Sequence, residues 1–205
     1  MNWIKPPGPV AEGLTIGLLG GSFDPAHGGH LYVSLTALKR LKLDYVWWLV
    51  SPGNPLKGAP AAFEKRLAGA RAMARHPRLI VTAIEQTLGT RYTLDTVKAL
   101  QRRFPQVRFV WLMGSDNLAN FHLWRNWRQI AARIPLVVVQ RPGSILAAVN
   151  AAPVRRFGKS RALKAPPAIV VLDGARSSES ATQLRALGIG DSAMLNSPLN
   201  RRKQP

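Results

Sequence analysis

The chain of 205 residues contains no cysteine. This absence excludes disulfides, thiolate chemistry and cysteine-ligated zinc, and it fits a protein of a reducing compartment. No apolar run approaches the roughly 20 residues that span a bilayer. Residues 1–12 hold three prolines and lack the apolar stretch of a secretory signal. We therefore expect a cytoplasmic protein without a membrane partner.

Acidic residues are scarce: 10 Asp and Glu stand against 29 Lys and Arg, which gives a formal net charge of +19. The stretch between Asp116 and Asp173 has no acidic residue at all, although many arginines and lysines fall there. Such a surface attracts polyanions, so a basic nucleic-acid-binding module is one alternative for this chain. We favour the simpler interpretation, a solvated basic face, and do not expect nucleic acid as a partner.

Six apolar runs have the composition of buried strands, and the segments between the first five show helical spacing, as at Leu31, Leu35, Leu38 and Leu41. Alternating strands and helices predict an α/β fold, a Rossmann-like doubly wound parallel sheet. With strand order 3-2-1-4-5, a ligand would bind where strands one and four diverge. The expected strands are Leu14–Leu19, Tyr45–Val50, Leu79–Thr82, Val107–Met113, Leu136–Gln140 and Ile169–Leu172.

One domain is expected over residues 14–190, preceded by an N-terminal extension, 1–13, and followed by a basic C-terminal tail, 191–205. Residues 150–167 are rich in Pro, Ala and basic residues, which predicts a loop or a loose insertion.

The segment from Gly20 to His30 joins the first predicted strand to a helix expected from Leu31 to Leu41. A glycine-rich strand end that opens into a helix exposes backbone N–H groups beside the positive end of the helix dipole, which suits a phosphate group. His27 and His30 could add cationic donors there. Zinc is a weaker alternative because no third ligand accompanies the pair. The fingerprints Gly-x-x-x-x-Gly-Lys-Ser/Thr and Gly-x-Gly-x-x-Gly are absent.

This segment resembles the signature of the nucleotidyltransferase superfamily, Gly-x-Phe-x-Pro-x-His-x-Gly-His. The resemblance implies that the segment holds the triphosphate of ATP. His27 and His30 would be catalytic and would donate hydrogen bonds to phosphate oxygens as negative charge moves to the leaving pyrophosphate. Residues that fill the fixed positions are Gly21, Phe23, Pro25, His27, Gly29 and His30, and the ATP-binding set expected here is Gly20, Gly21, Ser22, Phe23, His27, Gly29 and His30.

A second segment, Ser180 to Arg185, resembles the C-terminal Ser-Ser/Thr-x-Ile/Leu-Arg motif of the same superfamily. Ser180 and Gln183 form a capping-box pattern, which predicts a short helix over Ser180–Leu187. The resemblance implies that Arg185 is catalytic and binds the β- or γ-phosphate, with Ser180 and Thr182 as further ATP donors. Ala181 stands where the superfamily has a second serine.

Further segments resemble the nicotinate mononucleotide adenylyltransferase family. They are Ser51–Lys57, Arg91–Thr96, Gly114–Asn117, Phe121–Ile130 and Arg141–Gly143. The resemblance implies a catalytic, phosphate-meeting Lys57 and an ATP contact at Gly114. Nicotinate mononucleotide would be bound by Lys57, Tyr92, Thr93, Asp116 and Trp124, with Trp124 stacked on the pyridine ring.

What the resemblance implies is adenylyl transfer from ATP to nicotinate mononucleotide, giving nicotinate adenine dinucleotide and pyrophosphate in NAD biosynthesis. Mg²⁺ would enter with ATP, and no protein metal ligand is expected. Nicotinamide mononucleotide and phosphopantetheine remain alternative acceptors. A homo-oligomer is compatible with the sequence, which leaves the oligomeric state open.

Overall fold

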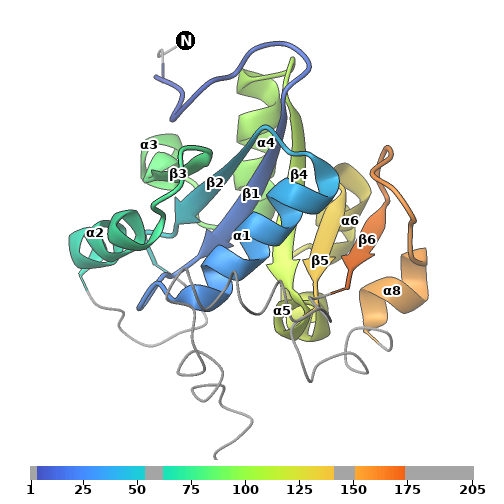
Figure 1. Cartoon of the computed structure of the whole chain (residues 1–205). Coiled ribbons are helices and arrows are strands. Elements are labelled where there is room, and N and C mark those ends of the chain that lie inside the picture. The colour runs from blue at the N-terminus through green and yellow to red at the C-terminus, as the bar shows by residue number, and fades with distance from the viewer. Residues whose placement is uncertain (1–3, 54–61, 141–150, 174–205) are drawn as a thin grey trace, which may run out of the picture.

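The computed structural model describes residues 4–53, 62–140 and 151–173. Its centre is a six-stranded sheet in which every pair of neighbouring strands is parallel, with strand order β3-β2-β1-β4-β5-β6 (Figure 1). The predicted doubly wound α/β fold and its strand order are confirmed, and β6 continues the sheet beside β5. The strands are β1 Thr15–Gly21, β2 Tyr45–Val50, β3 Leu79–Thr82, β4 Arg108–Gly114, β5 Leu136–Val139 and β6 Ile169–Leu172.

Helices cover both faces of the sheet. In Figure 1, α1 crosses in front of the strands, and α4 and α6 lie behind them. None of the helices in the described ranges combines the length and the apolar character that crossing a bilayer requires. The helices are α1 Gly28–Leu41, α2 Phe63–Met73, α3 Ile84–Leu88, α4 Thr93–Arg103, α5 Ser115–Asn120, the 3-10 helix η1 Phe121–Leu123, α6 Trp127–Arg133 and α8 Ala152–Phe157.

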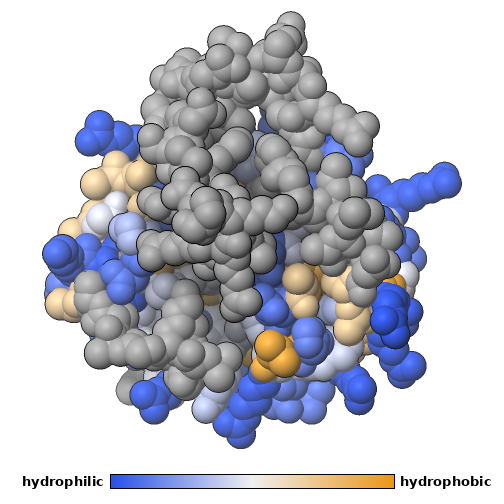
Figure 2. Space-filling view, turned by 90° about the horizontal axis from the view of Figure 1, so that it is seen from below, coloured by the Kyte–Doolittle hydropathy of each residue, from blue (hydrophilic) through white to orange (hydrophobic). Residues whose placement is uncertain are grey.

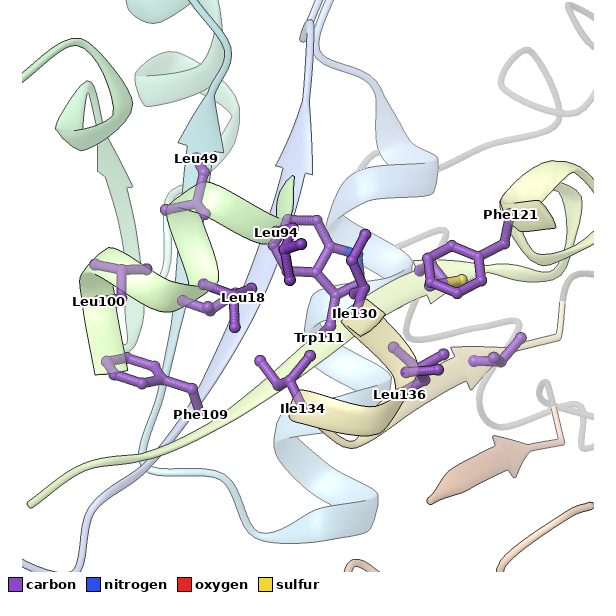
Figure 3. Close-up of a cluster of buried hydrophobic side chains, with 14 of the residues drawn as sticks. Leu18, Leu49, Leu94, Leu100, Phe109, Trp111, Phe121, Ile130, Ile134 and Leu136 are labelled. Atoms are coloured by element: carbon purple, nitrogen blue, oxygen red, sulfur yellow. The ribbon is translucent and has the colours of Figure 1, made fainter. Parts of the chain in front are cut away.

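Two hydrophobic clusters fill the space between the sheet and its helices. Strand residues alternate between them: Leu18 and Trp47 pack toward α4, whereas Leu19 and Trp48 pack toward α1. Figure 3 shows the cluster on the α4 side, where Leu94 and other helical side chains meet the strands. Because both faces of a parallel sheet are buried, each strand reads as a continuous apolar run, which is why the strands were recognisable in the sequence.

The described part of the expected N-terminal extension is held at the edge of the sheet where the parallel strands begin. Val10 packs against the cluster on the α4 side. The Gln106 side-chain amide donates to the Val10 carbonyl (2.7 Å), and the Gly13 N–H donates to the Gln106 carbonyl (3.3 Å). The domain boundaries stay predictions.

The prediction of a loop or loose insertion over residues 150–167 is wrong for its first half, which forms α8. Pro153 stands in the first turn, where its missing N–H costs no hydrogen bond. Pro153 and Val154 are buried, and the Ser160 backbone bridges to Val170 of β6. Proline is common in loops, but at this position it lies in the first turn of a helix.

The predicted loop between the first strand and the first helix is shorter than expected. β1 continues through Gly21, and α1 begins at Gly28 rather than at Leu31. The connection therefore spans only residues 22–27. His30 consequently lies in the first turn of α1, beside the helix N-terminus, instead of in a loop.

Gly20 is required by packing as well as by its place at the strand end. A methyl group at this position would lie 2.8 Å and 2.9 Å from two ring atoms of Trp111, whose side chain is buried and rigid. We expect Gly20→Ala to lower the free energy of unfolding by about 1–3 kcal/mol through overpacking. Urea-induced unfolding measures this change.

Gly69→Ala is the matched control, because Gly69 lies within α2 and has no heavy atom within 4 Å of an added methyl group. This variant should gain up to about 1 kcal/mol from helix propensity. Equal stabilities for Gly20→Ala and the wild type would contradict the packing argument.

Candidate active site

A cavity of about 730 Å³ opens at the carboxyl edge of the sheet, where β1 and β4 diverge. This volume lies within the range of small-molecule sites. Figure 2 looks onto this edge, and hydrophilic residues are prominent on the right and lower rims of its coloured surface. Every expected site residue that the structure describes lines this cavity: Gly20, Gly21, Ser22, Phe23, His27, Gly29, His30, Tyr92, Thr93, Gly114, Asp116 and Trp124.

The remaining expected site residues, Lys57, Ser180, Thr182 and Arg185, lie outside the described residues. The cavity runs over the edge of the sheet from one face to the other. One end is formed by the β1–α1 connection and the first turn of α1, and the other by residues near the start of α4 and by Trp124 after η1. Gly114, at the end of β4, lies on its lining between them.

His27 and His30 cap the N-terminus of α1 with reciprocal hydrogen bonds. The Gly29 N–H donates to His27 Nδ1 (3.1 Å), and the His27 N–H donates to His30 Nδ1 (3.2 Å). A ring nitrogen that accepts carries no proton, so each neutral imidazole carries its proton on Nε2. Both rings can therefore donate a hydrogen bond from Nε2 while they are neutral. Donation to a phosphate does not require the cationic imidazoles that the sequence suggested.

Aromatic contacts fix the ring of His30. Its centroid lies 4.6 Å from that of Phe23 and 4.0 Å from that of His27, and Phe23 stacks on Trp48 (5.1 Å). The Trp48 indole N–H donates to the Ser34 hydroxyl (2.7 Å), which donates to the His30 carbonyl (2.8 Å). Phe23 has a backbone φ of +50°, a conformation that is costly for a bulky residue and is held here by full burial of its ring.

A buried arginine joins the two connections that follow β1 and β2. Arg66 of α2 is only 3% exposed. Its Nη1 donates to the carbonyls of Ser22 (2.6 Å) and Ser51 (2.8 Å), and its Nη2 donates to the Pro52 carbonyl (3.2 Å). These carbonyls partner a charge that would be expensive to bury alone. Arg66 therefore holds the cavity wall formed by the β1–α1 connection against the segment after β2.

Indole rings link the two ends of the cavity. Trp111 of β4 packs on the backbone of Gly20 and meets Trp124 edge to face, with centroids 6.1 Å apart at 88°. Trp124 is half-buried and also contacts Phe121 (5.2 Å). The ring of Trp124 is thus held in one orientation, and it lines the cavity.

At the far end of the cavity, the chain enters α4. Tyr92 is the N-cap residue and Thr93 is the first helical residue. The first N–H groups of a helix have no acceptor within the helix, so this wall presents backbone donors. The guanidinium of Arg125 lies over the Tyr92 ring, 4.5 Å from its centroid.

Glu85 is a buried acid on the cavity lining. The Thr96 hydroxyl donates to Glu85 Oε1 (2.9 Å) and lies 2.9 Å from the Thr90 hydroxyl. Burial raises the pKa of Glu85 to about 7, an effect that the hydrogen bond from Thr96 partly opposes. This cluster ties α3 to the first turn of α4 and so helps to hold Tyr92 and Thr93 in place.

Among the residues that the structure describes, no group of three or more His, Asp or Glu side chains is arranged to hold a metal ion. The expectation that His27 and His30 are not zinc ligands stays a prediction. The acids that line the cavity, Asp24 and Asp116 besides Glu85, come from different elements.

Sequence reasoning missed several residues of this site. Arg66 directly follows two exposed charged residues, Glu64 and Lys65, and Glu85 lies in a segment of mixed polarity, so no pattern marks either residue as buried. Arg91 and Arg125 lie within the recognised segments Arg91–Thr96 and Phe121–Ile130 without an assigned role, and only the fold brings them to one cavity. The sequence identified Trp48 only as a residue of an apolar strand and did not reveal its contacts with Phe23 and Ser34.

Comparisons with known proteins agree with this geometry. The cytidylyltransferase-like family model matches residues 18–187. A protein of Cereibacter sphaeroides named "Probable nicotinate-nucleotide adenylyltransferase" is 50% identical over 182 residues, which cover 85% of this chain and 98% of that protein. A Parvibaculum lavamentivorans protein of the same name is 50% identical over 191 residues, with 87% and 94% covered.

Solved structures share the fold at low identity. A Plasmodium falciparum nicotinic acid mononucleotide adenylyltransferase complexed with NaAD aligns with a TM-score of 0.66 and 15% identity, covering 93% of this chain and 86% of that one. A second structure of that enzyme, complexed with APC, aligns with a TM-score of 0.62 and 16% identity, covering 81% and 77%.

The role of Arg66 yields a stability prediction. Arg66→Met should lower the free energy of unfolding by about 3 kcal/mol, because three carbonyls lose their buried donor. Arg71→Met, on the exposed face of the same helix, should change it by less than about 0.5 kcal/mol. Denaturant titration of both variants measures the difference, and equal stabilities would contradict the assignment.

The raised pKa of Glu85 predicts a pH-dependent stability. A carboxyl whose folded-state pKa lies above its unfolded value of 4.5 contributes its full stability below that value and loses it as the pH rises through about 7. Relative to Glu85→Gln, the wild type should therefore lose stability of the order of 3 kcal/mol between pH about 4.5 and about 7. Unfolding free energies measured across this range test it.

The exposed Glu64→Gln serves as the control and should follow the wild-type curve. Parallel curves for the wild type and Glu85→Gln would show that Glu85 does not titrate in this range.

Proposed function

The chain belongs to the nicotinate-nucleotide adenylyltransferase family and has its cytidylyltransferase-like domain, and we propose that its cavity transfers the adenylyl group of ATP to nicotinate mononucleotide. The products are nicotinate adenine dinucleotide and pyrophosphate, in NAD biosynthesis. One observation carries the proposal: a single cavity where β1 and β4 diverge is lined by described residues of the Gly20–His30 segment and of the segments Arg91–Thr96, Gly114–Asn117 and Phe121–Ile130.

The triphosphate of ATP binds at the start of α1 in this proposal. Backbone N–H groups of Gly20–Phe23 and the positive end of the α1 dipole favour the anion, while the N–H groups of His27 and Gly29 are bound by the capping imidazoles. His27 and His30 donate from Nε2 as negative charge moves to the leaving pyrophosphate. The proposed phosphate site is completed by Lys57, Ser180, Thr182 and Arg185. For these four residues the proposal rests on their sequence motifs alone.

Nicotinate mononucleotide binds at the other end of the cavity. Its pyridine ring stacks on Trp124, whose orientation Trp111 and Phe121 fix. The ring carboxylate meets the backbone donors of Tyr92 and Thr93 at the start of α4. Asp116, in the first turn of α5, contacts the nucleotide.

The reaction needs no protein nucleophile. A phosphate oxygen of nicotinate mononucleotide attacks the α-phosphorus of ATP in line, the bond to the β-phosphate oxygen breaks, and pyrophosphate leaves with the electron pair. The protein contributes positioning and hydrogen-bond donors for the growing charge. Mg²⁺ enters bound to ATP and supplies further charge neutralisation.

Three alternatives predict different results in one assay. Pyrophosphate release is measured with Mg²⁺ and ATP, and with nicotinate mononucleotide, nicotinamide mononucleotide or phosphopantetheine as the acceptor. We expect the highest kcat/KM with nicotinate mononucleotide. A nucleic-acid-binding module would instead release no pyrophosphate and would bind RNA with a steep salt dependence.

The expected cytoplasmic location stays a prediction.

Substitution of the capping histidine tests its catalytic role. His30→Ala should lower kcat by a factor of roughly 10² or more, because a donor to the transition state is lost. His122→Ala is the matched control, since His122 is exposed and is not among the residues that line the cavity. Circular dichroism shows whether each variant keeps its fold. Near-normal turnover by a folded His30→Ala would refute the role.

A further inference from the structure

Arg125 occupies a defined position at the pyridine end of the cavity. It follows Trp124 directly, and its guanidinium carbon lies 4.5 Å from the centroid of the Tyr92 ring, well within cation–π range. Arg125, Tyr92 and Trp124 all line the same cavity. Stacking on Tyr92 gives a side chain that is otherwise exposed a preferred place on the lining of this cavity.

We propose that the Arg125 side chain is a specificity-determining residue that favours an acceptor nucleotide whose ring carries a carboxylate over one whose ring carries a neutral amide. The inference rests on the proposed function, because it concerns the acceptor of that same site. It assigns selectivity to a side chain, in addition to the backbone donors of Tyr92 and Thr93.

Charge is the basis of the selection. The pyridinium ring of nicotinate mononucleotide has one positive charge and one carboxylate, so its ring moiety has no net charge. The ring moiety of nicotinamide mononucleotide keeps its positive charge. A fixed guanidinium beside the ring attracts the carboxylate and repels the uncompensated cation.

Hydrogen-bond geometry favours the same choice. A guanidinium presents only donors in a planar fork, which matches the two acceptor oxygens of a carboxylate. The carboxamide has one acceptor oxygen, and its NH₂ group is a donor. One N–H of a forked pair would then face another donor, so the amide cannot reproduce the bidentate contact.

Neighbouring charges support a carboxylate at this end. Arg91, next to Tyr92, adds a second cation on the cavity lining. Glu85 lies on the same lining, and burial raises its pKa to about 7, so near neutral pH it repels an incoming anion less than an ordinary glutamate would. The other lining acids come from other elements: Asp24 follows β1, and Asp116 lies in α5.

The chain offers a matched control for Arg125. Arg128 also lies over an aromatic ring, with its guanidinium carbon 5.4 Å from the centroid of Trp127. Both arginines are exposed, and their replacement by glutamine changes the net charge equally. Arg128, however, is not among the residues that line the cavity.

The test is the ratio of kcat/KM for nicotinate mononucleotide to that for nicotinamide mononucleotide, measured as pyrophosphate release with Mg²⁺ and ATP. Arg125→Gln should lower this ratio by about tenfold or more, mainly by raising KM for nicotinate mononucleotide. Arg128→Gln should leave the ratio within about twofold of the wild type. The KM for ATP should stay unchanged in both variants, because Arg125 lies at the acceptor end.

Arg125→Lys separates charge from geometry. It keeps the positive charge and loses the planar fork, so its ratio should fall between those of Arg125→Gln and the wild type. Thermal unfolding midpoints close to that of the wild type would show that the exposed substitutions leave the fold intact.

Two failures are distinguishable. A wild-type protein that releases no pyrophosphate with either nucleotide would overturn the proposed function itself. A wild type active on nicotinate mononucleotide whose ratio is unchanged in Arg125→Gln, or falls equally in Arg128→Gln, would overturn only the assignment of Arg125. An equal loss of kcat/KM for both nucleotides in Arg125→Gln would likewise overturn selectivity.

Discussion

The pairing of β1 with β2 on one side and with β4 on the other is the constraint on which this site depends. After β1 the chain continues into α1 on one face, whereas β4 is preceded by α4 on the other. The carboxyl ends of these two neighbouring strands therefore open into a crevice that none of the helices in the described ranges fills. Two helix N-termini, those of α1 and α4, meet this crevice from opposite faces. A molecule with an anionic group at each end matches that arrangement better than a single small anion would.

Buried polar contacts give the crevice its rigidity. Arg66 joins the carbonyls of Ser22 and Ser51, and Glu85 is hydrogen-bonded to Thr96 at the first turn of α4. Neither side chain could be buried without these partners. Each therefore couples the stability of the fold to the position of one wall of the cavity. The excess of 29 basic over 10 acidic residues surrounds this site with a field that favours anionic ligands.

The sheet was predictable from the sequence because both its faces are buried, so every strand appears as an apolar run. The site was predictable where a sequence motif falls on a predicted strand-to-helix connection, as at Gly21, His27 and His30. The tautomers of the two histidines were not predictable, since they depend on backbone hydrogen bonds that form only when α1 starts at Gly28. The hydrogen-bond partners of Arg66 could not be predicted either, because Arg66 and Ser22 are 44 residues apart in the sequence and no local pattern encodes their contact. α8 was missed because proline marks both a loop and the first turn of a helix.

The central claim is that one crevice holds ATP at the start of α1 and the pyridine ring of the acceptor near the start of α4. A crystal structure with a non-hydrolysable ATP analogue and nicotinate mononucleotide tests it most directly. We expect phosphate oxygens within hydrogen-bond distance of Nε2 of His27 and His30, and the pyridine ring stacked on Trp124. Electron density for both ligands away from this crevice, or a crevice closed by side chains, would contradict it.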